Sequence, residues 1–312
     1  MKKIVFMGTP DFSVSVLEQL IKSPYEIVLV VTQPDRPVGR KRTLTPPPVK
    51  KLAQKHHIPV YQPENIRTQY EQILAYEPDL IVTAAYGQIL PIELLEAPPY
   101  KCINVHASLL PKLRGGAPIH YAILEGESET GITIMYMVEQ LDAGDIISQE
   151  KIVITESDDV GTLHDKLAEL GSHLLIDTLP DIFSRSIQPV KQDEQLATYA
   201  PNITRELEKI NWQDSQENVY NHIRGLRPWP VAYTTLDGEQ MSVWSGEKDN
   251  TTYQASPGEI VQITEDAIIV ACGDQKGIRL TEIQPAGKRR MAVTNYLHGA
   301  KEQVKKGIIL GN

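Results

Sequence analysis

The chain has 312 residues, of which 41% are hydrophobic and 23% are charged, so it is long enough for two domains and has the composition of an ordinary globular protein. Its formal net charge of −9 at pH 7 argues against a general attraction to nucleic acid. Its two cysteines, Cys102 and Cys272, lie far apart in sequence, which argues against a disulfide framework and indicates a reducing compartment.

The first thirty residues predict a βαβ unit. Residues 3–7 form an apolar run typical of a buried parallel strand, residues 14–21 have helical apolar spacing, and residues 26–32 form a second strand. This opening favours a doubly wound α/β sheet. Gly8 stands alone where a dinucleotide site needs three glycines, so a nucleotide cofactor is disfavoured. The apolar run is too short for a secretion signal, and no run reaches the roughly 18 residues that a membrane span needs. We expect a cytoplasmic protein that does not contact membranes.

A proline-rich basic segment follows at residues 33–48. Its prolines exclude a helix or a central strand, and loops of this length are usually functional or disordered. A second basic stretch lies near the C-terminus. Two basic patches on an acidic body are typical of a protein that holds a polyanion, although they could also be solvated surfaces. The residues that we expect to contact phosphate are Arg36, Arg40, Lys41, Arg42, Lys288, Arg289 and Arg290.

Polar side chains interrupt an apolar strand at residues 102–106. Because side chains alternate along a strand, Asn104 and His106 project from the same face. Asn is depleted in strands, and ligands of open α/β sheets bind beyond the carboxyl ends of the strands. Asp142 lies in a glycine-containing loop after the strand that begins at residue 131, and such an Asp can orient an imidazole. The structural alternative is that Asn104 and His106 are satisfied polar residues of a sheet.

The second half of the chain changes in character. Residues 160–179 form an amphipathic helix, and the polar, proline-containing stretch after it is typical of a linker. Short strands separated by Gly, Asp and Asn then predict a small antiparallel, OB-like β-barrel. We expect an α/β domain at 1–188, a linker at 189–204 and the barrel at 205–312. The histidines and cysteines show no metal-ligand spacing, so no metal is expected.

Two motifs resemble the folate-dependent formyltransferases. They are N-x-H-x-S-L-L-P at 104–111 and G-x-T-I-x-Y-M-x-E-x-L-D-x-G-D at 131–145. The segments MGTPDFSVSVLEQL, VTQPDRPVGR, AAYGQILP and IQPAGKRRM extend the resemblance over nearly the whole chain. They are similar to the members of that family that act on an aminoacylated initiator tRNA.

The resemblance implies a Rossmann-like formyltransferase domain followed by a tRNA-binding barrel. It implies 10-formyltetrahydrofolate as co-substrate and aminoacylated initiator tRNA as partner, and we expect a monomer. Asn104 would stabilise an oxyanion, His106 would relay protons, and Asp142 would hold the imidazole or an ordered water in line. The implied folate contacts are Leu90, Ser108, Leu109, Leu110 and Pro111.

Three other functions remain open. One is a formyltransferase acting on a purine-pathway amine, which residues 205–312 argue against. Another acts on a sugar nucleotide, which the basic segments disfavour relative to RNA. The third is a tRNA-binding or chaperone-like protein with an inactive transferase domain, which the three intact polar residues disfavour.

Overall fold

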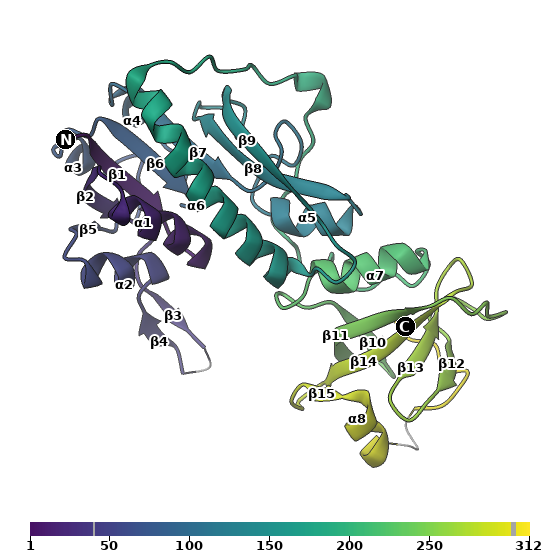
Figure 1. The fold of residues 1–312 in the computed structure, drawn as a ribbon. Helices are drawn as coiled ribbons and strands as arrows, with labels where there is room; N and C mark the ends of the chain where they lie inside the picture. The colour runs from purple at the N-terminus through teal and green to yellow at the C-terminus, as the bar shows by residue number, and fades with distance from the viewer. Residues whose placement is uncertain (40, 301–303) are drawn as a thin grey trace. The chain divides into compact units, whose positions relative to one another are not determined.

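The computed structural model describes residues 1–39, 41–300 and 304–312 and shows two compact units (Figure 1). The first unit comprises Met1–Pro118, Glu129–Val153 and His164–Ala200, and the second comprises Ile119–Ser128, Ile154–Leu163 and Pro201–Asn312. Residues 189–200, which were expected to belong to a linker, thus pack with the first unit. None of the helices in the described ranges has both the length and the apolar character needed to cross a bilayer.

The first unit contains a seven-stranded sheet in the order β5-β2-β1-β6-β7-β8-β9. Its strands are β1 (Lys3–Gly8), β2 (Glu26–Val31), β5 (Val60–Tyr61), β6 (Leu80–Ala84), β7 (Cys102–His106), β8 (Glu129–Tyr136) and β9 (Ile146–Val153). The strands from β5 to β7 are parallel, while β8 and β9 are antiparallel additions at one edge. The chain moves outward from β1 to β5 and then returns to the other side of β1 with β6. This reversal is the doubly wound pattern, so the predicted α/β class is confirmed.

Helices cover this sheet: α1 (Asp11–Lys22), α2 (Pro48–Lys55), α3 (Glu71–Leu74), α4 (Ile92–Glu96) and α6 (Val160–Ser184). Helix α6 approaches β7 and β8 closely at Gly171. A Cβ atom at this position would lie 2.9 Å from Val105 Cγ1 and 3.3 Å from Ile132 Cδ1. Gly171 therefore permits tight packing on the back of the strand that carries Asn104 and His106.

Part of the basic segment 33–48 is paired rather than a loop. It contains a two-stranded antiparallel hairpin of β3 (Arg36–Val38) and β4 (Thr43–Thr45), which forms a sheet of its own. An isolated ribbon has two edges, so Pro37 needs no N–H for a further strand. The prediction that no central strand forms here is confirmed, but the expectation of an irregular loop was wrong.

The second unit is built on an antiparallel sheet in the order β10-β11-β14-β13-β12, with β15 paired to β14. The strands are β10 (Tyr233–Leu236), β11 (Glu239–Asp249), β12 (Ile260–Ile263), β13 (Ile268–Ala271), β14 (Gly277–Pro285) and β15 (Met291–Ala292). The helices assigned here are α5 (Pro118–Leu124), α7 (Gln216–Gly225) and α8 (Val293–Ala300).

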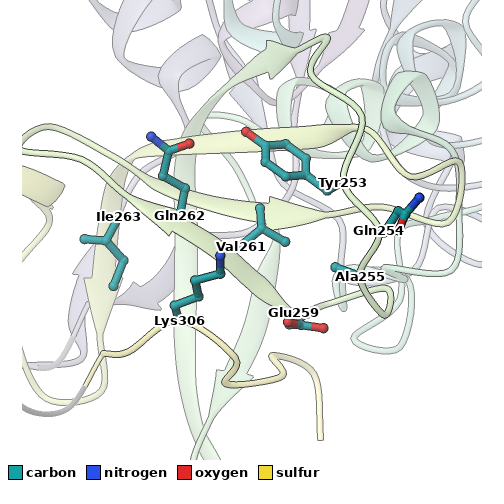
Figure 2. A pocket seen from close by; sticks show the side chains of 8 residues that line it. All are labelled: Tyr253, Gln254, Ala255, Glu259, Val261, Gln262, Ile263 and Lys306. Atoms are coloured by element: carbon teal, nitrogen blue, oxygen red, sulfur yellow. The ribbon is translucent and has the colours of Figure 1, made fainter.

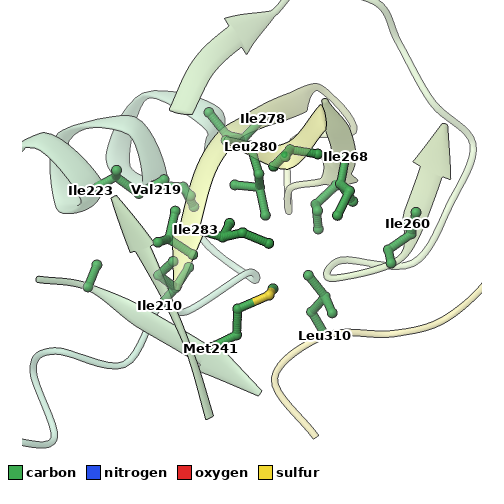
Figure 3. Close-up of a cluster of buried hydrophobic side chains, with 14 of the residues drawn as sticks. Ile210, Val219, Ile223, Met241, Ile260, Ile268, Ile278, Leu280, Ile283 and Leu310 are labelled. Atoms are coloured by element: carbon green, nitrogen blue, oxygen red, sulfur yellow. The ribbon is translucent and has the colours of Figure 1, made fainter. Parts of the chain in front are cut away.

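The last residues join the two outer strands of this sheet. Leu310 N–H donates to Gly258 O at 2.8 Å, just before β12, and Gly311 N–H donates to Thr235 O of β10 at 2.9 Å. The Leu310 side chain is 3% exposed and enters the apolar core beside Met241 (Figure 3). The sheet therefore curls around its core and is closed by a main-chain segment, in agreement with the predicted small barrel.

Candidate active site

Asn104 is oriented by a neighbour on the next strand. In the parallel register of β6 and β7, Thr83 pairs with Asn104, and its hydroxyl donates to Asn104 Oδ1 at 2.8 Å. The amide oxygen is therefore engaged within the sheet, and the NH2 group of the half-buried side chain is the donor that faces away from Thr83. Such a donor at the end of a strand can stabilise negative charge that develops on a substrate oxygen.

His106 is 6% exposed, and its Nε2 lies 3.0 Å from the main-chain oxygen of Leu113. Because a carbonyl only accepts hydrogen bonds, Nε2 carries the hydrogen and Nδ1 is the basic nitrogen of the neutral ring. Nδ1 lies 3.8 Å from Asp142 Oδ2. This distance is too long for a direct hydrogen bond, but the carboxylate still stabilises a proton that arrives on Nδ1.

Asp142 is held by the main chain of the loop after β7. Gly115 N–H donates to Asp142 Oδ2 at 2.8 Å. Gly115 has φ +117°, and a Cβ there would lie 2.7 Å from Ala200 O, so only glycine fits. The sequence predicted that Asp142 holds either the imidazole or an ordered water in line. The structure shows the carboxylate bonded to Gly115 N–H, with Oδ2 3.8 Å from His106 Nδ1, and the role of Asp142 stays a prediction.

The five predicted folate contacts differ in exposure. Leu90 and Leu110 are 2% and 3% exposed, and Ser108 is fully buried with its hydroxyl donating to Lys112 O at 2.6 Å. The side chains of Leu109 and Pro111 are partly exposed. Three of the five side chains therefore pack or hydrogen-bond within the protein, so folate contacts there would have to use main-chain groups. These contacts stay a prediction.

Sequence reasoning missed the residues that support this loop. Thr133 Oγ1 accepts from Leu110 N–H at 3.1 Å and donates to Ser108 O at 2.6 Å. Gln149 Nε2 donates to Leu110 O at 2.9 Å and to Thr133 Oγ1 at 2.8 Å. The sequence gives little indication of this role for Thr133. The residue is recognised only when the antiparallel register of β7 and β8 places it opposite His106.

The predicted phosphate contacts of the hairpin lie in the first unit. Lys41 and Arg42 are exposed, while Arg36 pairs with Glu64 at 3.1 Å on the surface. Arg40 lies outside the described residues. Arg36 therefore has a carboxylate partner that a phosphate would have to replace.

The other three predicted phosphate contacts lie in the second unit. Lys288 and Arg289 are exposed. Arg290 pairs with Glu282 at 2.6 Å, which raises the pKa of the guanidinium, and it lies 4.3 Å from the centre of the Trp244 ring. Contact with nucleic acid stays a prediction for both groups.

A cavity of about 570 Å³ opens on the second unit (Figure 2). Its lining residues are Tyr253, Gln254, Ala255, Glu259, Val261, Gln262, Ile263 and Lys306. None of the predicted catalytic or folate-contacting residues belongs to it. Within the described ranges, no group of three or more His, Cys, Asp or Glu side chains could hold a metal ion.

An amide donor, a buried imidazole and a carboxylate thus meet at the carboxyl end of β7, an arrangement suited to acyl transfer with proton relay. Residues 1–179 match the family described as formyl transferase, and residues 202–301 match the formyl transferase C-terminal domain. The chain therefore belongs to the formyl transferases.

Similarity over the full length narrows this class. The chain is 60% identical over 314 residues to the methionyl-tRNA formyltransferase of Geobacillus sp. (strain WCH70), covering 100% of this chain and 99% of that one. It is 61% identical over 313 residues to the methionyl-tRNA formyltransferase of Bacillus cytotoxicus, with the same coverage. Within the class, the chain belongs to the methionyl-tRNA formyltransferase family.

Solved structures share the fold. The N-formyltransferase from Helicobacter canadensis, solved with folinic acid and dTDP-3-aminofucose, has a TM-score of 0.68 at 20% identity, covering 91% of this chain and 100% of its own. The sugar 3N-formyl transferase WlaRD has a TM-score of 0.67 at 21% identity, covering 93% and 99%. At this identity the likeness concerns the architecture.

Proposed function

We propose that this protein transfers the formyl group of 10-formyltetrahydrofolate to the free amino group of methionyl-tRNA for translation initiation. Relatives about 60% identical over the whole chain carry the name of this activity. The observation that carries the proposal is that Asn104 and His106 lie two positions apart at the end of β7 and that His106 Nδ1 lies 3.8 Å from the Asp142 carboxylate. The likeness to sugar formyltransferases is confined to the fold, so the sugar-nucleotide alternative gains no further support.

Formyl transfer requires a hydrogen-bond donor for the formyl oxygen, which gains negative charge, and a base for the proton that leaves the substrate amine. Bound 10-formyltetrahydrofolate supplies the formyl carbon, whose bond to the folate nitrogen breaks as its bond to the substrate amine forms. Asn104 donates an amide N–H to the oxygen that gains negative charge, a contribution worth about 10²–10³ in rate. His106 Nδ1 accepts the proton that leaves the amine and returns it to the folate nitrogen, worth roughly 10²–10⁴. The Asp142 carboxylate stabilises the transient imidazolium.

The loop 108–111 suits a planar, hydrogen-bonding co-substrate. It begins two residues after His106, and its main chain is held by Thr133 and Gln149. We place the folate contacts in this loop and at Leu90, through the partly exposed side chains of Leu109 and Pro111 and through the main-chain groups that Thr133 and Gln149 leave available. The basic residues of the hairpin and those near 290 would contact the tRNA, and the enzyme would act as a cytoplasmic monomer.

The test is folate-dependent formylation in vitro. Purified protein should formylate methionyl-tRNA but neither uncharged tRNA nor an amino-sugar nucleotide. His106→Ala and Asp142→Ala should each lower kcat by about 10² or more while the protein remains folded by circular dichroism. His56→Ala, which removes an exposed imidazole from the same unit, is the matched control and should leave kcat unchanged. Turnover of the amino-sugar nucleotide without turnover of methionyl-tRNA would contradict the proposal.

A further inference from the structure

The segment 192–200, expected to be part of a linker, is bonded to the loop that follows β7. Arg114 N–H donates to Thr198 O at 2.9 Å, and Ala200 N–H donates to Arg114 O at 2.7 Å. Ala117 N–H in turn donates to Ala200 O at 3.0 Å. The segment therefore fixes the main chain on both sides of Arg114, between the residues that hold the imidazole and the carboxylate.

The Arg114 side chain is fully buried and extends into the same segment. Its Nη1 and Nη2 donate to the two carboxylate oxygens of Glu194 at 3.0 and 2.9 Å, which raises the pKa of the guanidinium and lowers that of the carboxyl. Its Nε and Nη2 also donate to Gln192 Oε1 at 3.1 and 2.8 Å. A buried guanidinium with these partners is well satisfied and geometrically specific.

Gln192 connects Arg114 to the loop that carries Asp142. The side chain is 4% exposed, and its Nε2 donates to Asp142 O at 2.8 Å and to Gly144 O at 2.7 Å. The amide can lie only one way round, because its oxygen faces a group that only donates and its nitrogen faces two oxygens that only accept. Asp142 has φ +49°, a conformation that a non-glycine residue keeps when its surroundings hold it.

We propose that Gln192 is a positioning residue for formyl transfer, an inference that rests on the function proposed above. It fixes the main chain at Asp142 so that the carboxylate faces His106 Nδ1. Arg114 orients Gln192 from one side, and Gly115 N–H anchors the carboxylate from the other. The stretch 192–200 is therefore part of the catalytic architecture.

Two substitutions distinguish the hydrogen bonds of the Gln192 amide oxygen from those of its nitrogen. Gln192→Glu keeps an oxygen for Arg114 but has no N–H to give to Asp142 O and Gly144 O. Gln192→Met removes both sets of bonds at similar volume. Both should lower kcat about 10²-fold, as expected for a shift of catalytic groups by about 1 Å. KM for methionyl-tRNA should change little. Gln54→Met, at an exposed glutamine of helix α2 in the same unit, is the matched control and should have wild-type kcat.

A double-mutant cycle distinguishes positioning from general loosening of the fold. If Gln192 acts through Asp142, Gln192→Glu should have almost no further effect on the residual rate of Asp142→Ala. A loss of the same factor in both backgrounds would overturn the proposal, and so would an unchanged kcat of the single variant.

Amide hydrogen exchange tests the role of Gln192 without any substrate. In Gln192→Glu, amides of 112–117 and 141–145 should exchange roughly tenfold faster than in the wild type, with β1 and β6 unchanged. Unchanged exchange in those two loops would overturn the proposal. A wild-type protein that does not formylate methionyl-tRNA would instead refute the proposed function, and exchange would still decide the role of Gln192.

Discussion

At the scale of the residue, Thr83 decides which end of the Asn104 amide is available. Its hydroxyl binds Asn104 Oδ1, so the NH2 group is left to act as a donor. Asn104→Ala should lower kcat by about 10²–10³ with little change in folate affinity, because an oxyanion donor acts mainly in the transition state. Thr83→Val removes the orienting bond, worth about 1 kcal/mol, together with the contacts of the same hydroxyl to Ile103 O and Met137 Sδ, and should lower kcat roughly fivefold.

Steady-state kinetics and a folate-binding titration on the two variants check this prediction. Thr68→Val removes an exposed hydroxyl of the first unit and should behave as the wild type. A loss confined to folate affinity in Asn104→Ala would move this residue from catalysis to binding.

The sequence allowed Asn104 and His106 to be placed on one face, because alternation along a strand depends on local spacing alone. It could not reveal Thr83 or Gln192. Thr83 meets Asn104 only through the register of two parallel strands, and Gln192 meets Asp142 across 50 positions of the chain. Pairings of this kind follow from tertiary packing, for which the local pattern gives no signal.

At the scale of the element, the β3–β4 hairpin carries Lys41 and Arg42 on its exposed tip. Binding of phosphates releases counterions, and each lost contact should lower the slope of log affinity against log salt by about one. Lys41→Ala with Arg42→Ala should therefore weaken binding of methionyl-tRNA and flatten the slope by about two. Folate affinity should not change.

The salt series is measured by filter binding at several ionic strengths. The matched control is Lys55→Ala with Arg67→Ala, which removes one exposed lysine and one exposed arginine from other parts of the same unit. An unaltered slope in the hairpin variant would show that its charges are only solvated.

The hairpin also marks a limit of sequence reasoning about elements. The prolines predicted correctly that no central strand forms at 33–48 and that no helix forms before α2 begins at Pro48. They could not predict the pairing of Arg36–Val38 with Thr43–Thr45, because short isolated strands have almost no apolar alternation. The strand 102–106, by contrast, was predicted with its observed bounds. Its apolar residues are buried on both faces of the sheet, and buried strands of this kind leave a short apolar run in the sequence.

At the scale of the whole molecule, the barrel unit depends on contacts made by its last residues. Leu310 is 3% exposed within the core, whereas the adjacent Ile309 is 40% exposed. Leu310→Ala should destabilise the second unit by about 2–5 kcal/mol, and Ile309→Ala should cost far less. The first unit should unfold as in the wild type.

Intrinsic fluorescence can report on this unit alone. The chain has three tryptophans, at 212, 229 and 244, and all of them belong to the second unit. Urea unfolding followed by tryptophan emission should show a lower midpoint for Leu310→Ala than for Ile309→Ala. Equal midpoints would mean that residues 308–311 do not secure the barrel.

The contact between Gln192 and Asp142 also has a consequence for the time at which the enzyme becomes competent. The carboxylate is synthesised 50 residues before the amide that holds its loop. At about 5–20 residues per second, a ribosome needs roughly 3–10 seconds to cover that distance. During this interval the nascent chain already contains Asn104, His106 and Asp142, but their arrangement still awaits a segment that has not been made.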